Sequence, residues 1–223
     1  MSLRALIFDL DDTLVESERL NEKILDDFLS REYRVTITPE DREKQYQFTW
    51  KEVFTFLAAE YGITESWEVL WQRFFAEKRR YLGGHGLRVA RGLRDLIHLP
   101  LSKAIVSGSE REEIFLMLGS ADIPREQFKV IVSADDCRNG KPDPEGYLKA
   151  LAALGVPPQE AQVFEDSPVG IQAARSAGIS VAFIREFARH DLCKEADVCF
   201  DTMADALPWV RERMEGTADA RRD

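Results

Sequence analysis

The sequence begins with the stretch Leu3-Arg4-Ala5-Leu6-Ile7-Phe8-Asp9, a nearly continuous apolar run that ends in an acid. Such a run is typical of a parallel strand that is buried on both faces. After residue 87, short apolar runs alternate with helical stretches. The further strands are predicted at 103–107, 128–133, 162–165, 179–184 and 198–200, and the helices near 89–98, 110–119, 144–154 and 168–177. This alternation predicts an α/β fold with a doubly wound parallel sheet, to which the first strand also belongs.

The segment between the first strand and residue 87 has a helical pattern throughout. Apolar side chains recur at helical spacing over residues 17–31, and Thr49 with Glu52 fits a capping box that opens a further helix. We therefore expect residues 1–15 and 87–223 to form an α/β core domain. Residues 16–86 are expected to form a helical domain inserted after the first strand.

Composition and charge limit the classes of function. The 223 residues are 44% hydrophobic and 31% charged, as in an ordinary soluble globular protein. No apolar run approaches the ~20 residues of a membrane span, and the start lacks the features of a signal peptide, so we expect a cytoplasmic protein without a membrane partner. The net charge of -10 disfavours nucleic acid as a partner, and it means that a phosphate site needs its own positive charge.

The cysteines and the oligomeric state are less informative. Cys137, Cys193 and Cys199 are odd in number and lack the spacing of a metal site, so we expect three reduced thiols. The sequence does not distinguish a monomer from a homodimer.

Polar residues follow several of the predicted strands at the point where each strand ends. They are Asp9 and Asp11 after the first strand, Ser107 at the end of the second, Lys141 in the loop before the 144–154 helix, and Glu165 and Asp166 at the end of the 162–165 strand. In a doubly wound sheet, ligands bind outside the carboxyl ends of the strands. We therefore expect these side chains to meet at one rim of the sheet.

A group of carboxylates at one rim requires a compensating charge. Two unit charges 4 Å apart interact by about 4 kcal/mol at an effective dielectric constant of about 20, so the group is stable only with protons or a cation. Oxygen ligands with room for water suit Mg²⁺. Ser107, Lys141 and the backbone N–H groups after Asp9 and around Gly108 could then hold a phosphate. One carboxylate could attack phosphorus while a second, two residues away, transfers protons.

These residues resemble the four signatures of the haloacid dehalogenase-like hydrolases. The segment Phe8–Leu14 is similar to the first signature, Ser107 to the second, and Lys141 within Gly140–Pro144 to the third. The stretch Glu165–Gly170, with the small residues that follow it, is similar to the fourth. The order matches, and the spacing leaves room for a helical cap. The resemblance is to the branch of phosphoglycolate phosphatases and β-phosphoglucomutases.

The resemblance implies catalytic and metal-binding roles. Asp9 would be the nucleophile and a Mg²⁺ ligand. Asp11 would be the general acid and base, and would bind Mg²⁺ through its backbone carbonyl. Asp166 would be the second carboxylate ligand, with Glu165 ligating the metal or supporting Asp166.

It also implies a phosphate site made of Ser107, Gly108, Lys141 and Thr13, in which Thr13 would orient the nucleophile and steady the turn. Asp12 departs from the pattern, because the family usually has glycine there. Since Asp tolerates unusual backbone angles better than most residues, we expect the turn to be kept.

The function implied by the resemblance is that of a Mg²⁺-dependent phosphatase for a small phosphorylated metabolite, such as phosphoglycolate or a sugar phosphate. The reaction would pass through an aspartyl-phosphate. The helical cap would select the substrate by closing over the site. Gln47, Trp50 and Lys51 lie at a predicted helix start and are candidate substrate contacts, although tryptophans here are also expected in the core of the cap.

Other functions remain open. A sugar phosphomutase of this family would carry a cap histidine where this chain has Asn21, which favours hydrolysis. A phosphonatase would use a cap lysine, and Lys23 and Lys51 are available without positive support. A dehalogenase would lack Asp11. A catalytically silent binding module on the same fold is the third alternative, because fold does not determine function.

Overall fold

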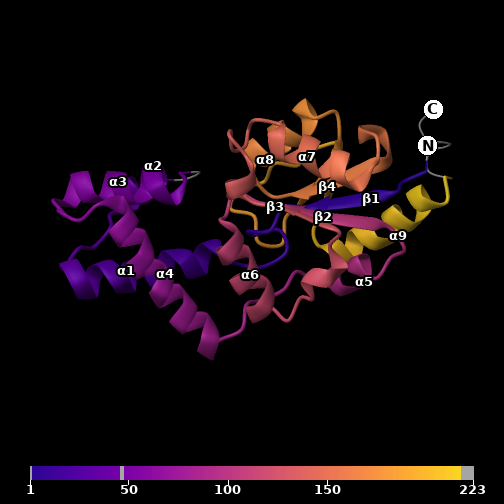
Figure 1. Cartoon of the computed structure of the whole chain (residues 1–223). Coiled ribbons are helices and arrows are strands. Elements are labelled where there is room, and N and C mark those ends of the chain that lie inside the picture. Colours follow the sequence, from indigo (N-terminus) through magenta and orange to yellow (C-terminus); the bar gives the residue numbers. More distant parts are fainter. Residues whose placement is uncertain (1, 46–47, 217–223) are drawn as a thin grey trace. The chain divides into compact units, whose positions relative to one another are not determined.

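The computed structural model describes residues 2–45 and 48–216, and it divides the chain into two compact units. The core unit comprises Met1–Glu16 and Leu87–Asp223, and the helical unit comprises Ser17–Gly86 (Figure 1). The core unit is an all-parallel sheet covered by helices on both faces, so the predicted fold class is confirmed.

The sheet of the core unit has the strand order β3-β2-β1-β4-β5-β6. The strands are β1 (Ala5–Phe8), β2 (Ser102–Val106), β3 (Val130–Val132), β4 (Ala161–Glu165), β5 (Ser180–Ile184) and β6 (Val198–Phe200). Strand β1 lies between β2 and β4, and Phe8 is opposite both Ile105 and Phe164. The residues that follow β1, β2 and β4 therefore emerge next to one another.

Helices cover both faces of this sheet (Figure 1). Helices α7 (Glu145–Leu154) and α8 (Pro168–Ser176) lie on one face, and α5 (Leu93–Ile97) and α9 (Met203–Met214) on the other, with α6 (Arg111–Ser120) after β2. Short 3₁₀ turns occur at Arg125–Gln127, Ala134–Asp136 and Pro158–Glu160. The strand residues of β1 and β4 are buried throughout, as expected between two helical layers.

Two helices of the core unit differ from the prediction. Helix α5 is shorter than the predicted 89–98 because Val89 pairs with Val15 in an antiparallel bridge. Helix α9 was not predicted, since Pro208 inside it interrupts the helical pattern, although Thr202 caps its start by accepting from the N–H of Asp205.

The helical unit contains α1 (Glu18–Tyr33), α2 (Pro39–Lys44), α3 (Trp50–Tyr61) and α4 (Trp67–Gly84). The predicted capping box of Thr49 and Glu52 is present, and α3 ends at Gly62 in the left-handed conformation. No helix in the described part of the chain is long and apolar enough to cross a membrane.

Aromatic rings form the centre of the helical unit. The ring of Trp50 lies 5.4 Å from that of Trp71 and 4.6 Å from that of Phe74, and the Phe54 and Phe74 rings are 5.6 Å apart. Phe54 and Phe74 are fully buried. We call these four side chains the aromatic cluster; it joins α3 to α4.

The expectation of three reduced thiols is wrong for one pair. Cys193, in the loop after β5, and Cys199 of β6 form a disulfide, whereas Cys137 is a free thiol. The pairing depends on the return of the chain from that loop to the edge strand, and a spacing of six residues does not reveal this return.

Candidate active site

The carboxyl ends of β1 and β4 bring together three charged residues that are far apart in the sequence. The ammonium group of Lys141 lies 2.6 Å from Asp9 Oδ1 and 2.6 Å from Glu165 Oε1. Carboxylate oxygens of Asp9, Glu165 and Asp166 all lie within 4.8 Å of one another. Four of the predicted site residues therefore surround one point at the rim of the sheet.

Burial makes this group electrostatically unusual. Desolvation raises the pKa of Asp9 to about 8 against the lowering effect of Lys141, and the carboxylates of Glu165 and Asp11 raise it further. Burial also holds the pKa of Asp166 well above its usual value, and the negative charges of Asp9 and Glu165 raise it further. Burial opposes the charge of Lys141, but Asp9 and Glu165 outweigh it and raise its pKa. One ammonium group thus does not neutralise the cluster.

Glu165 is fully buried, and donors occupy both of its oxygens. Oε1 accepts from Lys141 and from the Tyr147 hydroxyl at 2.8 Å. Oε2 accepts from the N–H of Asp166 at 3.1 Å, and from both the N–H and the hydroxyl of Ser167 at 3.2 and 3.0 Å. Because both oxygens are engaged, Glu165 is suited to orient Lys141 and the start of α8.

Gly170 makes room for this carboxylate. A Cβ atom at position 170 would lie 1.8 Å from Glu165 Oε1, a distance at which the carboxylate would have to move. The glycine of the fourth motif therefore lets the backbone of α8 approach Glu165 closely.

Asp11 is held by two serines that follow β2. Its Oδ2 atom accepts from the Ser109 hydroxyl at 3.0 Å and from the Ser107 hydroxyl at 3.3 Å. Ser107 Oγ in turn accepts from the N–H of Ser109 at 3.0 Å. Gly108 lies in the bend between them and is exposed. Ser107 was predicted from the sequence, whereas Ser109 was not.

The turn after Asp9 differs in one contact from what we expected. The Thr13 hydroxyl donates to Asp166 Oδ1 at 3.0 Å, so it steadies the carboxylate of the fourth motif, whereas we expected it to orient Asp9. Asp12 has φ 52° and adopts the left-handed conformation, as expected of a residue at a glycine position. Its N–H donates to the carbonyl of Val15 at 2.8 Å, which closes the turn.

Residues 6–184 match the profile of the haloacid dehalogenase-like hydrolases. The chain belongs to this family. The family prediction is therefore confirmed, and the four motifs of this hydrolase lie within, and in the order of, the matched region.

Two relatives of this haloacid dehalogenase-like hydrolase are named as phosphatases. The phosphorylated carbohydrates phosphatase of Thermotoga maritima is 32% identical over 181 residues, which are 79% of this chain and 82% of the relative. The validoxylamine A 7'-phosphate phosphatase of Streptomyces hygroscopicus subsp. limoneus is 31% identical over 205 residues, 87% of this chain and 92% of the relative. The predicted enzyme class, a phosphoric monoester hydrolase, agrees with both names.

The fold is also that of a solved relative. A mutant of CbbY from Rhodobacter sphaeroides, in complex with xylulose-1,5-bisphosphate, superposes with a TM-score of 0.80 and 23% identity. The alignment covers 91% of this chain and 96% of that chain.

The family implies a divalent cation, and the residues of this hydrolase fit one. Asp9 and Asp166 present carboxylate oxygens close to each other and to Glu165. Desolvation by burial is the main cause of the raised pKa of both carboxyl groups, and a bound cation would oppose it by stabilising their charged forms. Oxygen ligands of this kind suit Mg²⁺. Since donors already occupy Glu165, Asp9 and Asp166 are the better carboxylate ligands.

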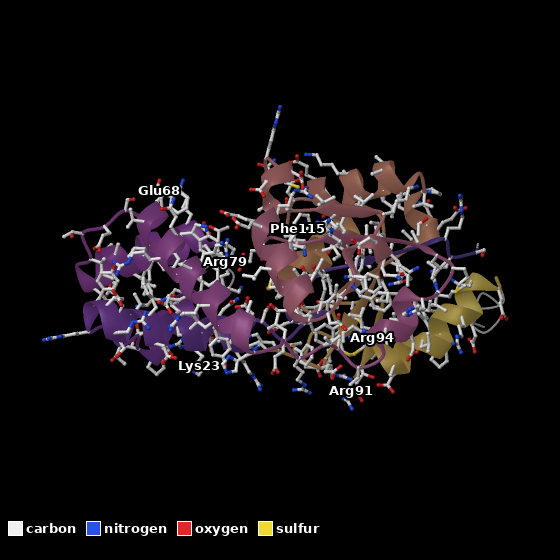
Figure 2. The ribbon with its side chains drawn as sticks, turned by 60° about the horizontal axis from the view of Figure 1, so that its bottom comes forward. Lys23, Glu68, Arg79, Arg91, Arg94 and Phe115 are labelled. Carbon is white, nitrogen blue, oxygen red and sulfur yellow. A yellow bond between two sulfur atoms is a disulfide. The ribbon has the colours of Figure 1, made fainter. Side chains whose placement is uncertain are left out.

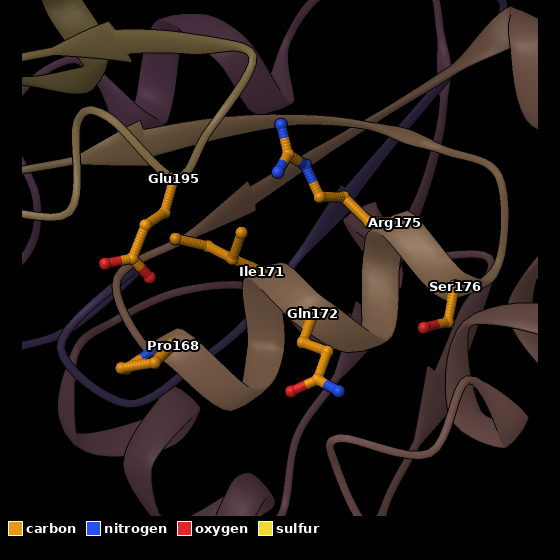
Figure 3. A pocket seen from close by; sticks show the side chains of 6 residues that line it. All are labelled: Pro168, Ile171, Gln172, Arg175, Ser176 and Glu195. Carbon is orange, nitrogen blue, oxygen red and sulfur yellow. The ribbon is translucent and has the colours of Figure 1, made fainter.

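A hollow of about 460 Å³ lies elsewhere on the core unit, along the outer side of α8 (Figure 3). It is lined by Pro168, Ile171, Gln172, Arg175, Ser176 and Glu195. Arg175 is paired with Asp197 at 3.2 Å. The lining contains none of the predicted site residues, so this hollow is not the predicted phosphate site.

The candidate substrate residues of the helical unit have different surroundings. Gln47 lies outside the described residues. Trp50 is half-buried and belongs to the aromatic cluster, in keeping with the packing role that we gave as its alternative. Lys51 is exposed on α3, with its ammonium group 5.6 Å from the centre of the Trp67 ring. Their contact with substrate remains a prediction.

Proposed function

We propose that this chain is a Mg²⁺-dependent phosphatase that hydrolyses a small phosphorylated metabolite, of the phosphoglycolate or sugar phosphate type, through an aspartyl-phosphate on Asp9. The observation that carries the proposal is the meeting of Asp9, Lys141 and Asp166 at the ends of β1 and β4. The phosphatase names of the two relatives support the reaction type, and one name supports a phosphorylated carbohydrate as substrate.

In the first half of the reaction, a carboxylate oxygen of Asp9 attacks phosphorus and the bond to the leaving oxygen breaks. Asp11 donates its proton to that oxygen. The hydroxyls of Ser107 and Ser109 hold Asp11 in place for this transfer. The ammonium group of Lys141 lies 2.6 Å from Asp9 Oδ1 in the structure. It is therefore close enough to contact an oxygen of a phosphoryl group bound next to Asp9.

In the second half, Asp11 accepts a proton from water, whose oxygen attacks phosphorus. The bond between Asp9 and phosphorus then breaks, phosphate leaves, and both acids return to their first state. A Mg²⁺ ion held by Asp9, Asp166 and the backbone carbonyl of Asp11 would supply positive charge for the phosphoryl oxygens. That charge matters in a chain whose net charge is -10.

The substitution Asp9→Asn tests the nucleophile. It keeps the size of the side chain but removes the attacking carboxylate, so release of phosphate from an aryl phosphate with Mg²⁺ should fall to the background rate. Asp122→Asn is a matched control, because it makes the same chemical change at an exposed aspartate that pairs with Arg94 at the surface. Near-normal turnover by the Asp9 variant would falsify the assignment. A product assay with sugar phosphates separates hydrolysis from the mutase alternative, since an isomer without free phosphate would indicate a mutase.

A further inference from the structure

The two segments that connect the units are bound to each other within the core unit. Residues 14–16 and 88–90 form an antiparallel pair, with a bridge between Val15 and Val89. Two backbone hydrogen bonds of 3.0 and 2.9 Å flank this bridge. We call this pair the linker ladder.

The linker ladder continues directly into the first motif. Asp11 forms a bridge with Val15, and the N–H of Asp12 donates to the Val15 carbonyl at 2.8 Å. The backbone of Asp11 is thus attached to the residue that pairs with Val89. A shift of the second connecting segment would be transmitted to Asp11 through a single residue.

Glu186 binds the second connecting segment at Arg91, directly after residues 88–90. It lies two residues after β5, and only 1% of its side chain is exposed. Its Oε2 atom accepts from the N–H of Arg91 at 2.8 Å, and its Oε1 atom accepts from Nε of the same residue at 2.9 Å. Arg91 lies near Arg94 of α5 (Figure 2). Backbone and side chain of one residue are therefore bound by a single carboxylate.

Further contacts strengthen the attachment of Arg91 to Glu186. The guanidinium of Arg88 lies 3.7 Å from Glu186 Oε1 and 5.0 Å from the centre of the Phe187 ring. The carbonyl of Arg91 accepts from the N–H of Ala204 at 2.8 Å, so both peptide groups of Arg91 are engaged. A buried carboxylate is stable only with such donors, and bonds to charged donors are stronger than neutral ones.

We propose that Glu186 is a positioning residue for the phosphatase reaction, because it holds Arg91, the residue directly after the linker ladder, and thereby the ladder and the backbone and carboxyl of Asp11. This rests on the proposed function. Glu186 does not touch the reacting atoms. Removal of the Glu186 carboxylate should slow proton transfer by Asp11, because misplacement of a catalytic group by about 1 Å can lower the rate about 100-fold.

The test compares Glu186→Ala with a matched control, Glu160→Ala. Glu160 also pairs with an arginine of the core unit, Arg4, at 2.8 Å, but neither Glu160 nor Arg4 belongs to the linker ladder. Deuterium uptake of residues 9–16 is measured first, without substrate. We expect Glu186→Ala to increase uptake there and Glu160→Ala to leave it unchanged. Equal uptake in the wild type and Glu186→Ala overturns the inference, whether or not the protein is a phosphatase.

Turnover is measured next, with an aryl phosphate and Mg²⁺. We expect Glu186→Ala to lower kcat about ten-fold and to change KM by less than about two-fold. Glu186→Gln should recover part of kcat, because its amide oxygen can still accept from the N–H of Arg91. An unchanged kcat in Glu186→Ala, or no recovery in Glu186→Gln, overturns the positioning role.

Failure of a variant to fold and absence of phosphatase activity have different consequences for the inference. If Glu186→Ala does not fold, as judged by circular dichroism, Glu186→Asp decides: it keeps the charge but shortens the reach, so wild-type uptake and kcat would overturn the inference. If the wild type releases no phosphate, the proposed function fails, while the uptake measurement still decides whether Glu186 holds the first motif.

Discussion

The rim of the core unit and the aromatic cluster of the helical unit are both buried, but their burial has opposite consequences. At the rim, Asp9, Lys141 and Glu165 carry charges that lose their hydration, which costs free energy unless partners restore it. In the cluster, Phe54 and Phe74 are neutral rings whose removal from water is favourable. Burial therefore costs free energy at the rim, where we propose that the reaction takes place, whereas it contributes stability in the aromatic cluster.

A second contrast separates the ion pairs of the two units. The Lys141 side chain is 13% exposed, and that of Glu165 is fully buried. In the helical unit, Arg42 pairs with Asp26 at 2.6 Å, with side chains 22% and 47% exposed. Solvent screens the second pair, so the coupling free energy between its two partners should be smaller than in the buried pair.

Lys141→Met should have the largest effect. It keeps much of the length of the side chain but removes the charge beside Asp9 and Glu165, so kcat should fall about a thousand-fold. Steady-state kinetics with an aryl phosphate and Mg²⁺ measure the loss. Lys149→Met is the control, because Lys149 pairs with Glu145 at the surface and should leave kcat unchanged. Equal kcat values for the two variants would contradict the role of the buried ammonium group.

Phe74→Ala should have the next largest effect, on stability. Its ring is fully buried among the aromatic cluster, so truncation leaves a cavity that should cost about 3 kcal/mol. Urea unfolding followed by tryptophan fluorescence reports mainly on the helical unit, which holds three of the four tryptophans, Trp50, Trp67 and Trp71. Val69 of the same helix is 42% exposed, and Val69→Ala should cost less than about 0.5 kcal/mol. A similar cost for both would show that the cluster does not stabilise the unit.

The Arg42–Asp26 pair should have the smallest effect. A double-mutant cycle with Arg42→Met and Asp26→Asn should give a coupling free energy below about 1 kcal/mol, since both side chains are partly exposed. Urea unfolding at low and at high salt measures it, and the coupling should decrease as salt is added. A coupling as large as the cost of Phe74→Ala would contradict the solvent screening expected for this pair.

The convergence at the rim could be predicted because it depends on strand order and on the ends of strands. Once β1 and β4 are recognised as parallel strands, Asp9 and Glu165 must emerge at the same edge. Asp12 could be predicted too, because its left-handed φ is one that Asp tolerates.

Other residues could not be predicted, because their roles depend on packing. Tyr147 lies within α7, and only the packing of that helix on the sheet brings its hydroxyl to Glu165. The motif suggested Ser107, but Ser109 carries no signal of its own until the bend after β2 is known. Glu186 follows a buried strand like many acids, and its partner Arg91 is 95 positions away.

The central position of β1 determines when the sheet can assemble during synthesis. Both neighbours of β1, namely β2 and β4, are made later, and β4 ends only at Glu165. The helical unit is a continuous segment that is complete by Gly86, long before β4 leaves the ribosome. Domains generally fold as units as the chain emerges, and pairing between distant strands is slow. The nascent chain should therefore carry a folded helical unit while its hydrophobic first strand still awaits both partners.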